Sequence, residues 1–280
     1  MGQINWHHIV SHHGKGAPKI TVVGGVHGDE LIGERVIKIL EHQPLHRGTL
    51  SLVIAHPLAR AKGKRFIKQD LNRSFPGKSQ GCLEERIAHK LSRQLSSSDL
   101  VVDVHATNSR ITSLAIVAKL IPAVCRILCY LPVKKVALIE RHVFGGKELI
   151  GNIKEGIALE YGPGKSGRNF RRALNHVRIL LRNLRMITGP CRQYPRKTLY
   201  RVSGQYRIPR GFKEARGLLD FRLIHKGQLI GRVGSRKIYA QETFYPVFLG
   251  RGRYPGVFSL KAQREFLSIP VIEKRQRDKR

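Results

Sequence analysis

The sequence predicts an α/β protein in which helices flank a mixed, twisted sheet, with a small β domain at the C-terminal end. Apolar runs rich in β-branched residues, typical of buried strands, occur at residues 20–24, 49–54 and 100–104. Between the first two runs, apolar residues recur at the spacing of one helix face. After Gly189 the chain is rich in short strands and glycine turns. We therefore expect an α/β domain over residues 1–188, a β-rich domain over residues 189–270 and a basic tail over residues 271–280.

Length and composition indicate a folded protein without a membrane segment. A chain of 280 residues, 41% of them hydrophobic, is long enough to bury a large core. The longest apolar region, residues 111–131, is interrupted by Lys119 and Arg126, so it predicts a core strand and helix and not a membrane span. The first residues lack the apolar core of a signal peptide. The four cysteines form no Cys-x-x-Cys pair and predict reduced thiols in a cytoplasmic protein.

Basic residues strongly outnumber acidic ones. The chain has 52 Lys and Arg against 19 Asp and Glu, a net charge of +33, and there is no Asp or Glu between Tyr161 and Lys213. Within this stretch, residues 170–186 are predicted to form a helix with one arginine-rich face. Such an excess favours nucleic acid or another polyanion as a partner of residues 161–213. A proteome-wide basic composition would give the same charge, so both interpretations stay open.

Two strands are expected near the N-terminal end, at residues 6–13 and 19–24, joined by a turn at residues 14–18. Together they would form an exposed hairpin that carries four histidines: His7, His8, His12 and His13. Because no carboxylate or cysteine accompanies these histidines, solvated surface side chains are favoured over a metal cluster.

The second strand runs into two glycines and then presents His27 and Glu30, in the motif GGVHGDE. Imidazole nitrogen and carboxylate oxygen both suit zinc. A catalytic zinc site usually has three protein ligands and leaves the fourth position to water, so a third ligand should lie farther along the chain. The pair alone is a weak signal, because a polar loop at a strand end explains it equally well.

A β-α-β unit is expected around this loop. The helix at residues 31–40 follows the loop directly, and the strand at residues 49–54 closes the unit. Parallel pairing in such units favours a ligand site at the carboxyl ends of the strands. Residues 61–77 lack apolar periodicity and predict a long polar loop, a common place for functional residues. A further helix is marked by Leu83, Ile87 and Leu91.

Two later strand ends supply further candidates. The run DLVVDVHATNS places His105 at the end of a buried strand, where it is the candidate third ligand, and Asp103 could orient its imidazole. A hydrogen-bonded core histidine is the alternative for His105. The run GIALEYGPG ends in Glu160, a carboxylate that is costly to bury unless it is paired or functional. Near a metal, Glu160 would be the natural general base, since zinc lowers the pKa of bound water and a base takes its proton.

Five motifs together resemble the succinylglutamate desuccinylase and aspartoacylase family, within the zinc carboxypeptidase superfamily. The motifs are GGVHGDE, RFIKQDLNRSFPG, DVHATNS, ALEYGP and, more weakly, YPVFLGRGRY. They occur in the family's order and span nearly the whole chain. The resemblance implies a zinc carboxypeptidase-like fold, with one Zn²⁺ per chain held by His27, Glu30 and His105.

The resemblance also implies roles for further residues. Arg65 would polarise the scissile carbonyl and stabilise the oxyanion. Asn72 and Arg73 would bind the substrate carboxylate, for which a guanidinium fork is well shaped. Glu160 would act first as the general base and then as the acid that protonates the leaving amine. Tyr254 matches a family tyrosine that contacts the substrate.

Two positions depart from the family pattern. Lys68 stands where many relatives place an acidic residue. Ile150 occupies the approach to the catalytic glutamate, where aspartoacylases carry an arginine for the substrate's side-chain carboxylate, and only Lys147 and Lys154 are nearby cations in the sequence. The general activity of the family is therefore better supported than either of the substrates in its name.

The function we expect is that of a zinc-dependent amidohydrolase. Such an enzyme hydrolyses a carbon-nitrogen bond other than a peptide bond, here in an N-acyl amino acid or a similar small amide. One alternative is a zinc carboxypeptidase that acts on peptides. Another is a basic, polyanion-binding protein that retains the fold.

Overall fold

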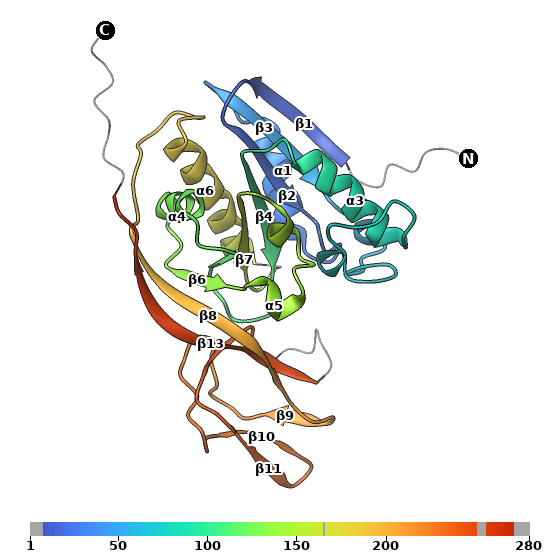
Figure 1. The fold of residues 1–280 in the computed structure, drawn as a ribbon, viewed down its shortest axis with the longest axis vertical. Helices are drawn as coiled ribbons and strands as arrows, with labels where there is room; N and C mark the ends of the chain where they lie inside the picture. Colours follow the sequence, from blue (N-terminus) through green and yellow to red (C-terminus); the bar gives the residue numbers. More distant parts are fainter. Residues whose placement is uncertain (1–7, 165, 251–255, 272–280) are drawn as a thin grey trace.

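The computed structural model describes residues 8–164, 166–250 and 256–271, with residues 8–13 described by their backbone alone. These residues form a ten-stranded mixed sheet and a three-stranded antiparallel sheet (Figure 1). From edge to edge, the strands of the large sheet are β1 (His8–Lys15), β3 (Gly48–Ile54), β2 (Lys19–Gly24), β4 (Leu100–Ala106), β7 (Gly156–Tyr161), β5 (Leu114–Val117), β6 (Lys135–Leu138), β8 (Arg196–Arg207), β13 (Val257–Ser268) and β12 (Tyr245–Val247). Those of the small sheet are β11 (Arg236–Tyr239), β10 (Leu229–Val233) and β9 (Phe212–Glu214). The predicted fold class is confirmed.

The centre of the large sheet is parallel and is buried on both faces. Strands β3, β2, β4 and β7 pair in parallel in that order. Because successive side chains of a strand point to opposite faces, Val22 packs in one core cluster and Val23 in another. The first cluster holds the apolar faces of α1 (Leu31–Leu40), α4 (Pro122–Cys129) and α6 (Gly167–Asn183). The second holds that of α3 (Leu83–Leu95) and the short helices η1 (Leu71–Arg73) and η2 (Leu149–Asn152).

Most elements with clear periodicity are where the sequence predicts them. The helix at residues 31–40 and the β2-α1-β3 unit with parallel strands are confirmed. Region 111–131 contains β5 and α4, as expected. Loop 61–77 is mostly irregular, but α2 (Pro57–Ala61) enters it and η1 lies inside it. Residues 132–155, for which no element is predicted, contain β6, α5 (Arg141–Phe144) and η2.

The expected N-terminal hairpin is wrong. Strand β1 pairs antiparallel with β3, and β2 lies between β3 and β4. Since both edges of β2 are occupied by parallel neighbours, the edge of β3 is the one open to β1. His7 and the side chains of His8, His12 and His13 lie outside the described part of the chain, so their predicted exposure stays a prediction.

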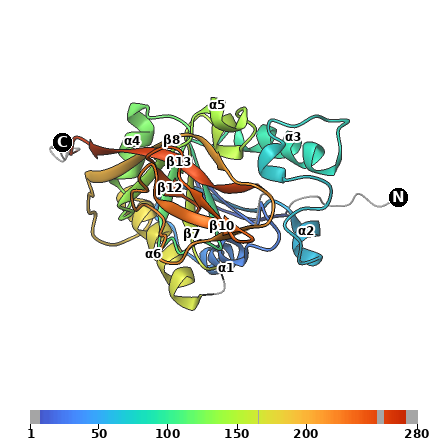
Figure 2. The same ribbon diagram turned by 90° about the horizontal axis from the view of Figure 1, so that it is seen from below.

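The C-terminal strands continue the large sheet. The long strands β8 and β13 pair along their length, and β8 joins the sheet through β6. In Figure 1 these two strands extend beyond the helical part, with β9, β10 and β11 at their far end, and in the view from below in Figure 2 β10 and β13 lie in front of β7. The large sheet therefore crosses residue 188. The division of the chain into domains at this residue stays a prediction.

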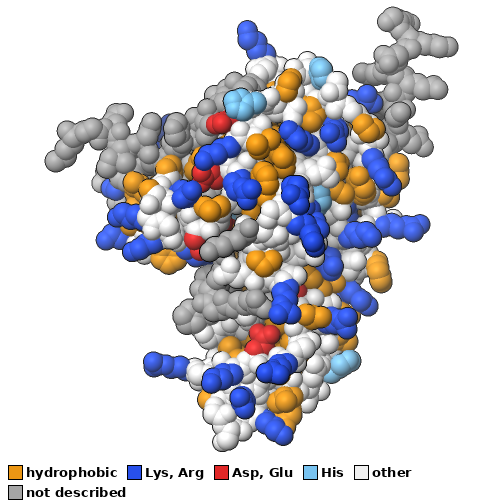
Figure 3. Space-filling view, turned by 180° about the vertical axis from the view of Figure 1, so that it is seen from behind, with side chains coloured by type: hydrophobic (Ala, Val, Ile, Leu, Met, Phe, Trp, Pro, Cys, Tyr) orange, Lys and Arg blue, Asp and Glu red, His pale blue; other side chains and the backbone are white. Residues whose placement is uncertain are grey.

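The predictions about membrane segments and about reduced thiols can be compared with the described residues. No helix among them is long and apolar enough to cross a membrane. All four cysteines are free thiols, as predicted. The Lys and Arg side chains visible in Figure 3 are spread over both the helical part and the small sheet, without one dominant cluster on that face.

Candidate metal centre and substrate cavity

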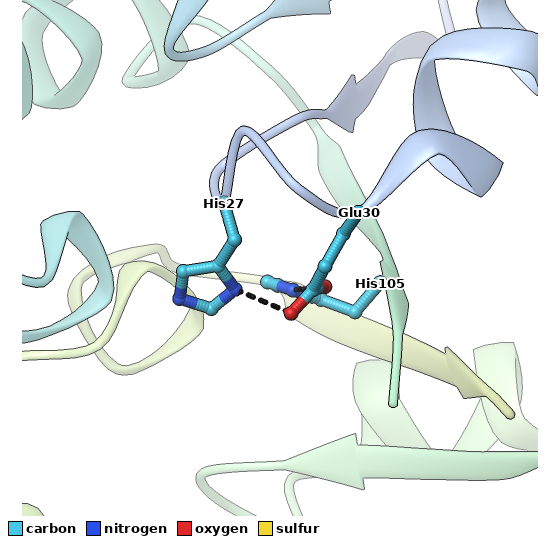
Figure 4. A group of neighbouring side chains, drawn as sticks. All are labelled: His27, Glu30 and His105. Carbon is cyan, nitrogen blue, oxygen red and sulfur yellow. Dashed lines mark hydrogen bonds and ion pairs between the residues drawn. The ribbon is translucent and has the colours of Figure 1, made fainter. Parts of the chain in front are cut away.

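Three buried side chains converge where the parallel strands end. His27 follows β2 after a turn at Gly25, whose φ of +65° is one that glycine adopts without strain. Glu30 is the residue before the first turn of α1, and His105 lies in β4. Figure 4 shows the side chains of His27 and His105 both directed toward the Glu30 carboxylate. Nδ1 of His27 lies 2.9 Å from Oε1 of Glu30, and Nδ1 of His105 lies 3.0 Å from Oε2.

The arrangement fits a metal ion. Behind each imidazole lies another carboxylate: Nε2 of His27 is 3.0 Å from Asp70 Oδ1, and Nε2 of His105 is 2.6 Å from Asp103 Oδ2. If each Nε2 donates its proton to that carboxylate, both Nδ1 lone pairs face the oxygens of Glu30. Such acceptors repel one another unless a cation lies between them. The candidate ligand atoms lie within 4.8 Å of one another, as a shared ion requires.

The charge balance of the centre also favours a cation. Burial by itself lowers the pKa of His105, but the carboxylates of Asp103 and Glu30 more than offset this and raise it well above its usual value. Burial likewise raises the pKa of Asp70, yet the hydrogen bond with His27 and the charges of Arg65 and Arg73 hold it well below its usual range. Burial acts in the same way on the pKa of Glu30, but His27 and His105 hold it well below its usual value, so Glu30 and Asp70 carry negative charge that attracts a cation.

Close packing of glycines brings Glu30 to the centre. A Cβ atom on Gly33 would lie 2.5 Å from the carbonyl oxygen of Val104 and 2.7 Å from Cα of Gly24, so only glycine allows α1 to approach β2 and β4 this closely. With the helix start in this place, the Glu30 carboxylate accepts a hydrogen bond of 2.9 Å from the backbone N–H of Ala106. Helix packing thus positions a candidate metal ligand.

The polar loop at residues 61–77 reaches the same centre. Nη1 of Arg65 donates to Glu30 Oε1 at 2.9 Å, and Nη2 of Arg65 donates to Asp70 Oδ2 at 3.2 Å. The fully buried carboxylate of Glu84 accepts hydrogen bonds from the backbone N–H groups of Ile67 and Lys68, at 2.8 and 2.9 Å. Glu84 therefore fixes the part of the loop that carries Arg65.

Asn72 and Arg73 lie at the far end of this loop. Oδ1 of Asn72 accepts a hydrogen bond of 2.9 Å from the backbone N–H of Leu149, which leaves the side-chain NH₂ group to donate. The Arg73 guanidinium lies 4.1 Å from the centre of the Phe144 ring and donates to the Asn72 carbonyl oxygen at 2.7 Å. Two groups suited to an anion are thus fixed side by side.

Glu160 lies directly beside the centre. In the parallel register of β4 and β7, Glu160 is opposite His105. A cavity of about 160 Å³ unites the predicted residues. It is lined by His27, Glu30, Arg65, Asn72, Arg73, His105 and Glu160, together with polar and apolar side chains from other elements. The structure therefore brings together every predicted site residue except Tyr254, which lies outside the described part of the chain.

Several cavity residues were not predicted. Gln205 of β8 and Ser259 of β13 reach the cavity from the C-terminal strands, and no local signal marks them. Glu148 also lines the cavity and is 6% exposed. The local sequence provides no signal for Glu148, because Lys147 precedes it directly and a glutamate in such a stretch is ordinarily solvated.

Fold and site together define an α/β protein with a candidate metal centre at the carboxyl ends of its parallel strands. Residues 16–171, more than half of the chain, match the model of the succinylglutamate desuccinylase/aspartoacylase catalytic domain. The chain belongs to this family.

Curated and structural relatives agree with this assignment. The chain is 28% identical over 186 residues to the N-acyl-aromatic-L-amino acid amidohydrolase (carboxylate-forming) of Xenopus tropicalis, a match that covers 58% of this chain and spans 60% of that protein's length. It is 25% identical to the human protein of the same name, over 91% of this chain and 93% of that one. The crystal structure of murine aminoacylase 3 has a similar fold, with a TM-score of 0.77 and 24% identity over 93% of this chain and 99% of that chain.

Proposed function

We propose that this chain is a zinc-dependent amidohydrolase that releases the acyl group from an N-acylated amino acid. The observation that carries this proposal is the position of Glu160 opposite His105 on neighbouring strands, in one cavity with the candidate metal ligands. A carboxylate at this place can take a proton from a water molecule held beside it. Family membership and the names of the relatives support the same chemistry.

The predicted site residues that line the cavity each have a role in this reaction. A zinc ion held by His27, Glu30 and His105, one per chain, would lower the pKa of water at the site. Glu160 would take the water's proton and deliver it to the leaving amine. Arg65, whose guanidinium is held in place by its contacts with Glu30 and Asp70, would polarise the scissile carbonyl and stabilise the oxyanion.

Substrate binding follows from the charges of the cavity. Asn72 and Arg73 would hold one carboxylate of the substrate. Among the described residues that line the cavity, Arg65 and Arg73 are the cations, while Ile150 contributes an apolar wall. A second substrate carboxylate against that wall would lose its hydration without a partner, at a cost of roughly 2–4 kcal/mol. N-acetylaspartate should therefore be a poor substrate.

Amine release from a panel of substrates tests this proposal. The panel contains N-acetyl amino acids with neutral side chains, N-acetylaspartate and short peptides with free carboxyl ends. We expect kcat/KM to be at least tenfold higher for the neutral N-acetyl amino acids than for N-acetylaspartate. The Ile150→Arg substitution should reduce this difference in kcat/KM. Turnover of peptides alone would indicate a carboxypeptidase, and turnover of none would contradict the proposal.

A further inference from the structure

The backbone around Arg65 is attached to the body of the protein on both sides of this residue. Most of the neighbouring loop residues are exposed, so packing alone does not hold them. Before the side chain, the N–H of Gly28 donates to the carbonyl oxygen of Arg65 at 3.1 Å. After it, the N–H groups of Ile67 and Lys68 donate to Oε1 of Glu84, at 2.8 and 2.9 Å. The second attachment depends on one buried side chain.

Glu84 is fully buried, and it is not among the described residues that line the cavity. Burial by itself raises the pKa of Glu84, but the hydrogen bonds from Lys68, Ile67 and His56 lower it below its usual value. The carboxylate is therefore ionised, and hydrogen bonds to an ionised acceptor are stronger than those to a neutral one. Glu84 can thus hold a loop that is otherwise open to solvent.

The carboxylate of Glu84 is held in turn by His56, which follows β3. His56 is fully buried, and its Nδ1 accepts a hydrogen bond of 3.4 Å from the N–H of Ala59. This contact leaves the proton of a neutral imidazole on Nε2, which lies 3.2 Å from Oε1 of Glu84 and can donate to it. Burial lowers the pKa of His56, although Glu84 acts in the opposite direction. A chain of contacts therefore joins the end of β3 to the loop of Arg65.

The groups assigned to the substrate carboxylate are held by other contacts. Oδ1 of Asn72 accepts from the N–H of Leu149, and Oδ1 of Asp70 contacts Nε2 of His27. Loss of the Glu84 contacts should therefore disturb Arg65 more than Asn72. A displacement of about 1 Å at a catalytic group can lower the rate by about a hundredfold.

We propose that Glu84 is a positioning residue that holds Arg65 against the scissile carbonyl, and that His56 fixes the Glu84 carboxylate for this purpose. The inference rests on the proposed function and adds to it two residues that do not touch the substrate. Glu84 acts on the reaction only through Arg65. Its loss should therefore lower kcat, while the binding of the substrate carboxylate by Asn72 and Arg73 is retained.

Two substitutions at Glu84 separate positioning from a general loss of structure. Glu84→Met removes the acceptor at nearly constant size and should lower kcat by about tenfold to a hundredfold, with KM changed by less than about threefold and zinc retained. Glu84→Gln keeps an acceptor oxygen and should retain most of kcat. The control is Glu85→Met, because Glu85 accepts from the N–H of Cys82 at the start of the same helix. This variant should lose stability and keep kcat. A normal kcat in Glu84→Met would overturn the inference.

A double-mutant cycle tests whether Glu84 acts through Arg65. Arg65→Ala should itself lower kcat by about a hundredfold to a thousandfold. In this background, Glu84→Met should lower kcat no further, because the group that it positions is already absent. An equal loss of kcat in both backgrounds would mean that Glu84 acts independently of Arg65, and would overturn the inference.

Hydrogen exchange in the unmodified protein tests the contacts without relying on the folding of a variant. The amides of Ile67 and Lys68 should exchange at least about a hundredfold more slowly than in an unfolded chain, although they lie in a loop that is largely exposed. Unprotected amides at both residues would overturn the inference while leaving the proposed function intact. If the unmodified enzyme hydrolyses no N-acyl amino acid of the panel, the proposed function fails, and this inference fails with it.

Discussion

At the scale of single residues, the candidate centre depends on carboxylates behind the ligands as much as on the ligands themselves. Asp103 and Asp70 each contact the Nε2 atom of one imidazole, so that both Nδ1 atoms face Glu30. Contacts of this kind set the tautomer and the orientation of a liganding histidine. Asp70 makes this contact with His27 and also pairs with Arg65, so it links the candidate metal centre to the polar loop.

His105→Ala should remove most of the zinc bound by the protein. The substitution leaves His27 and Glu30 as the remaining members of a set that needs three protein ligands. Elemental analysis of purified protein measures the effect, with His42→Ala, an exposed histidine beyond the end of α1, as the control. Full zinc occupancy in His105→Ala would show that the zinc is bound elsewhere.

Glu160→Gln should retain zinc and lower kcat by about a hundredfold to ten-thousandfold, because an amide of nearly the same size cannot accept the proton of the water. Activity assays together with zinc analysis separate this outcome from a loss of metal. The control is Glu155→Gln, which makes the same chemical change at a residue just before β7. Near-normal turnover with zinc retained would mean that a different group is the base.

At the scale of elements, the placement of helix α1 decides whether Glu30 can be a ligand. Glu30 precedes the first turn of the helix, and its carboxylate reaches His105 and the backbone of Ala106. This placement requires backbone contact between Gly33 of the helix and Gly24 at the end of β2. Neither position has space for a Cβ atom. A substitution on the buried surface of α1 should therefore also alter the candidate metal centre.

Gly33→Ala should destabilise the protein by about 1–3 kcal/mol, because the added methyl overlaps the backbone of β2 and β4. It should also weaken zinc binding by displacing Glu30. Urea unfolding and competition with a chelator measure the two effects. In Gly167→Ala, at the first position of α6, the added methyl meets no atom within 4 Å, so this control should be neutral or slightly stabilising. Equal behaviour of the two variants would contradict this account of the helix placement.

At the scale of the whole molecule, the excess of basic residues has different consequences at the surface and in the core. On the face shown in Figure 3 the basic side chains are dispersed over both parts of the molecule, and a polyanion partner for residues 161–213 stays a prediction. In the core, Lys197 is 3% exposed and its Nζ donates to the carbonyl oxygens of Leu131 and Val133, at 2.6 and 2.9 Å. It thus satisfies backbone groups that follow helix α4.

The contribution of Lys197 to the free energy of unfolding should increase as the pH rises from 7 to 9.5. Burial lowers the pKa of Lys197 from 10.5 to about 8. Between these values the unfolded chain binds the proton more tightly than the folded one, so raising the pH favours folding, by about 2 kcal/mol over this range. The difference in the free energy of unfolding between the wild type and Lys197→Met, measured at several pH values, isolates this contribution. A difference that does not change with pH would show that Lys197 titrates normally.

The sequence by itself determined the central strands, helix α1 and the residues of the candidate site. Apolar runs of β-branched residues marked the central strands, and helical spacing marked α1 with its observed bounds, because these patterns depend on local geometry alone. His27, Glu30, His105 and Glu160 were identifiable because polar residues at the ends of buried strands are costly unless they have a function. The motifs that contain them also identified the family.

Only the tertiary structure decided which distant segments meet. The pairing of β1 with β3 in place of β2, and the arrival of β8 and β13 at the cavity, depend on which sheet edges are open once the parallel centre has formed. The contacts of Asp70 with His27, and of Glu84 with the Arg65 loop, depend likewise on the folded course of the polar loop. Glu148 could not be distinguished from a solvated surface glutamate until its burial was known, because exposure is a property of the packed molecule and not of the local sequence.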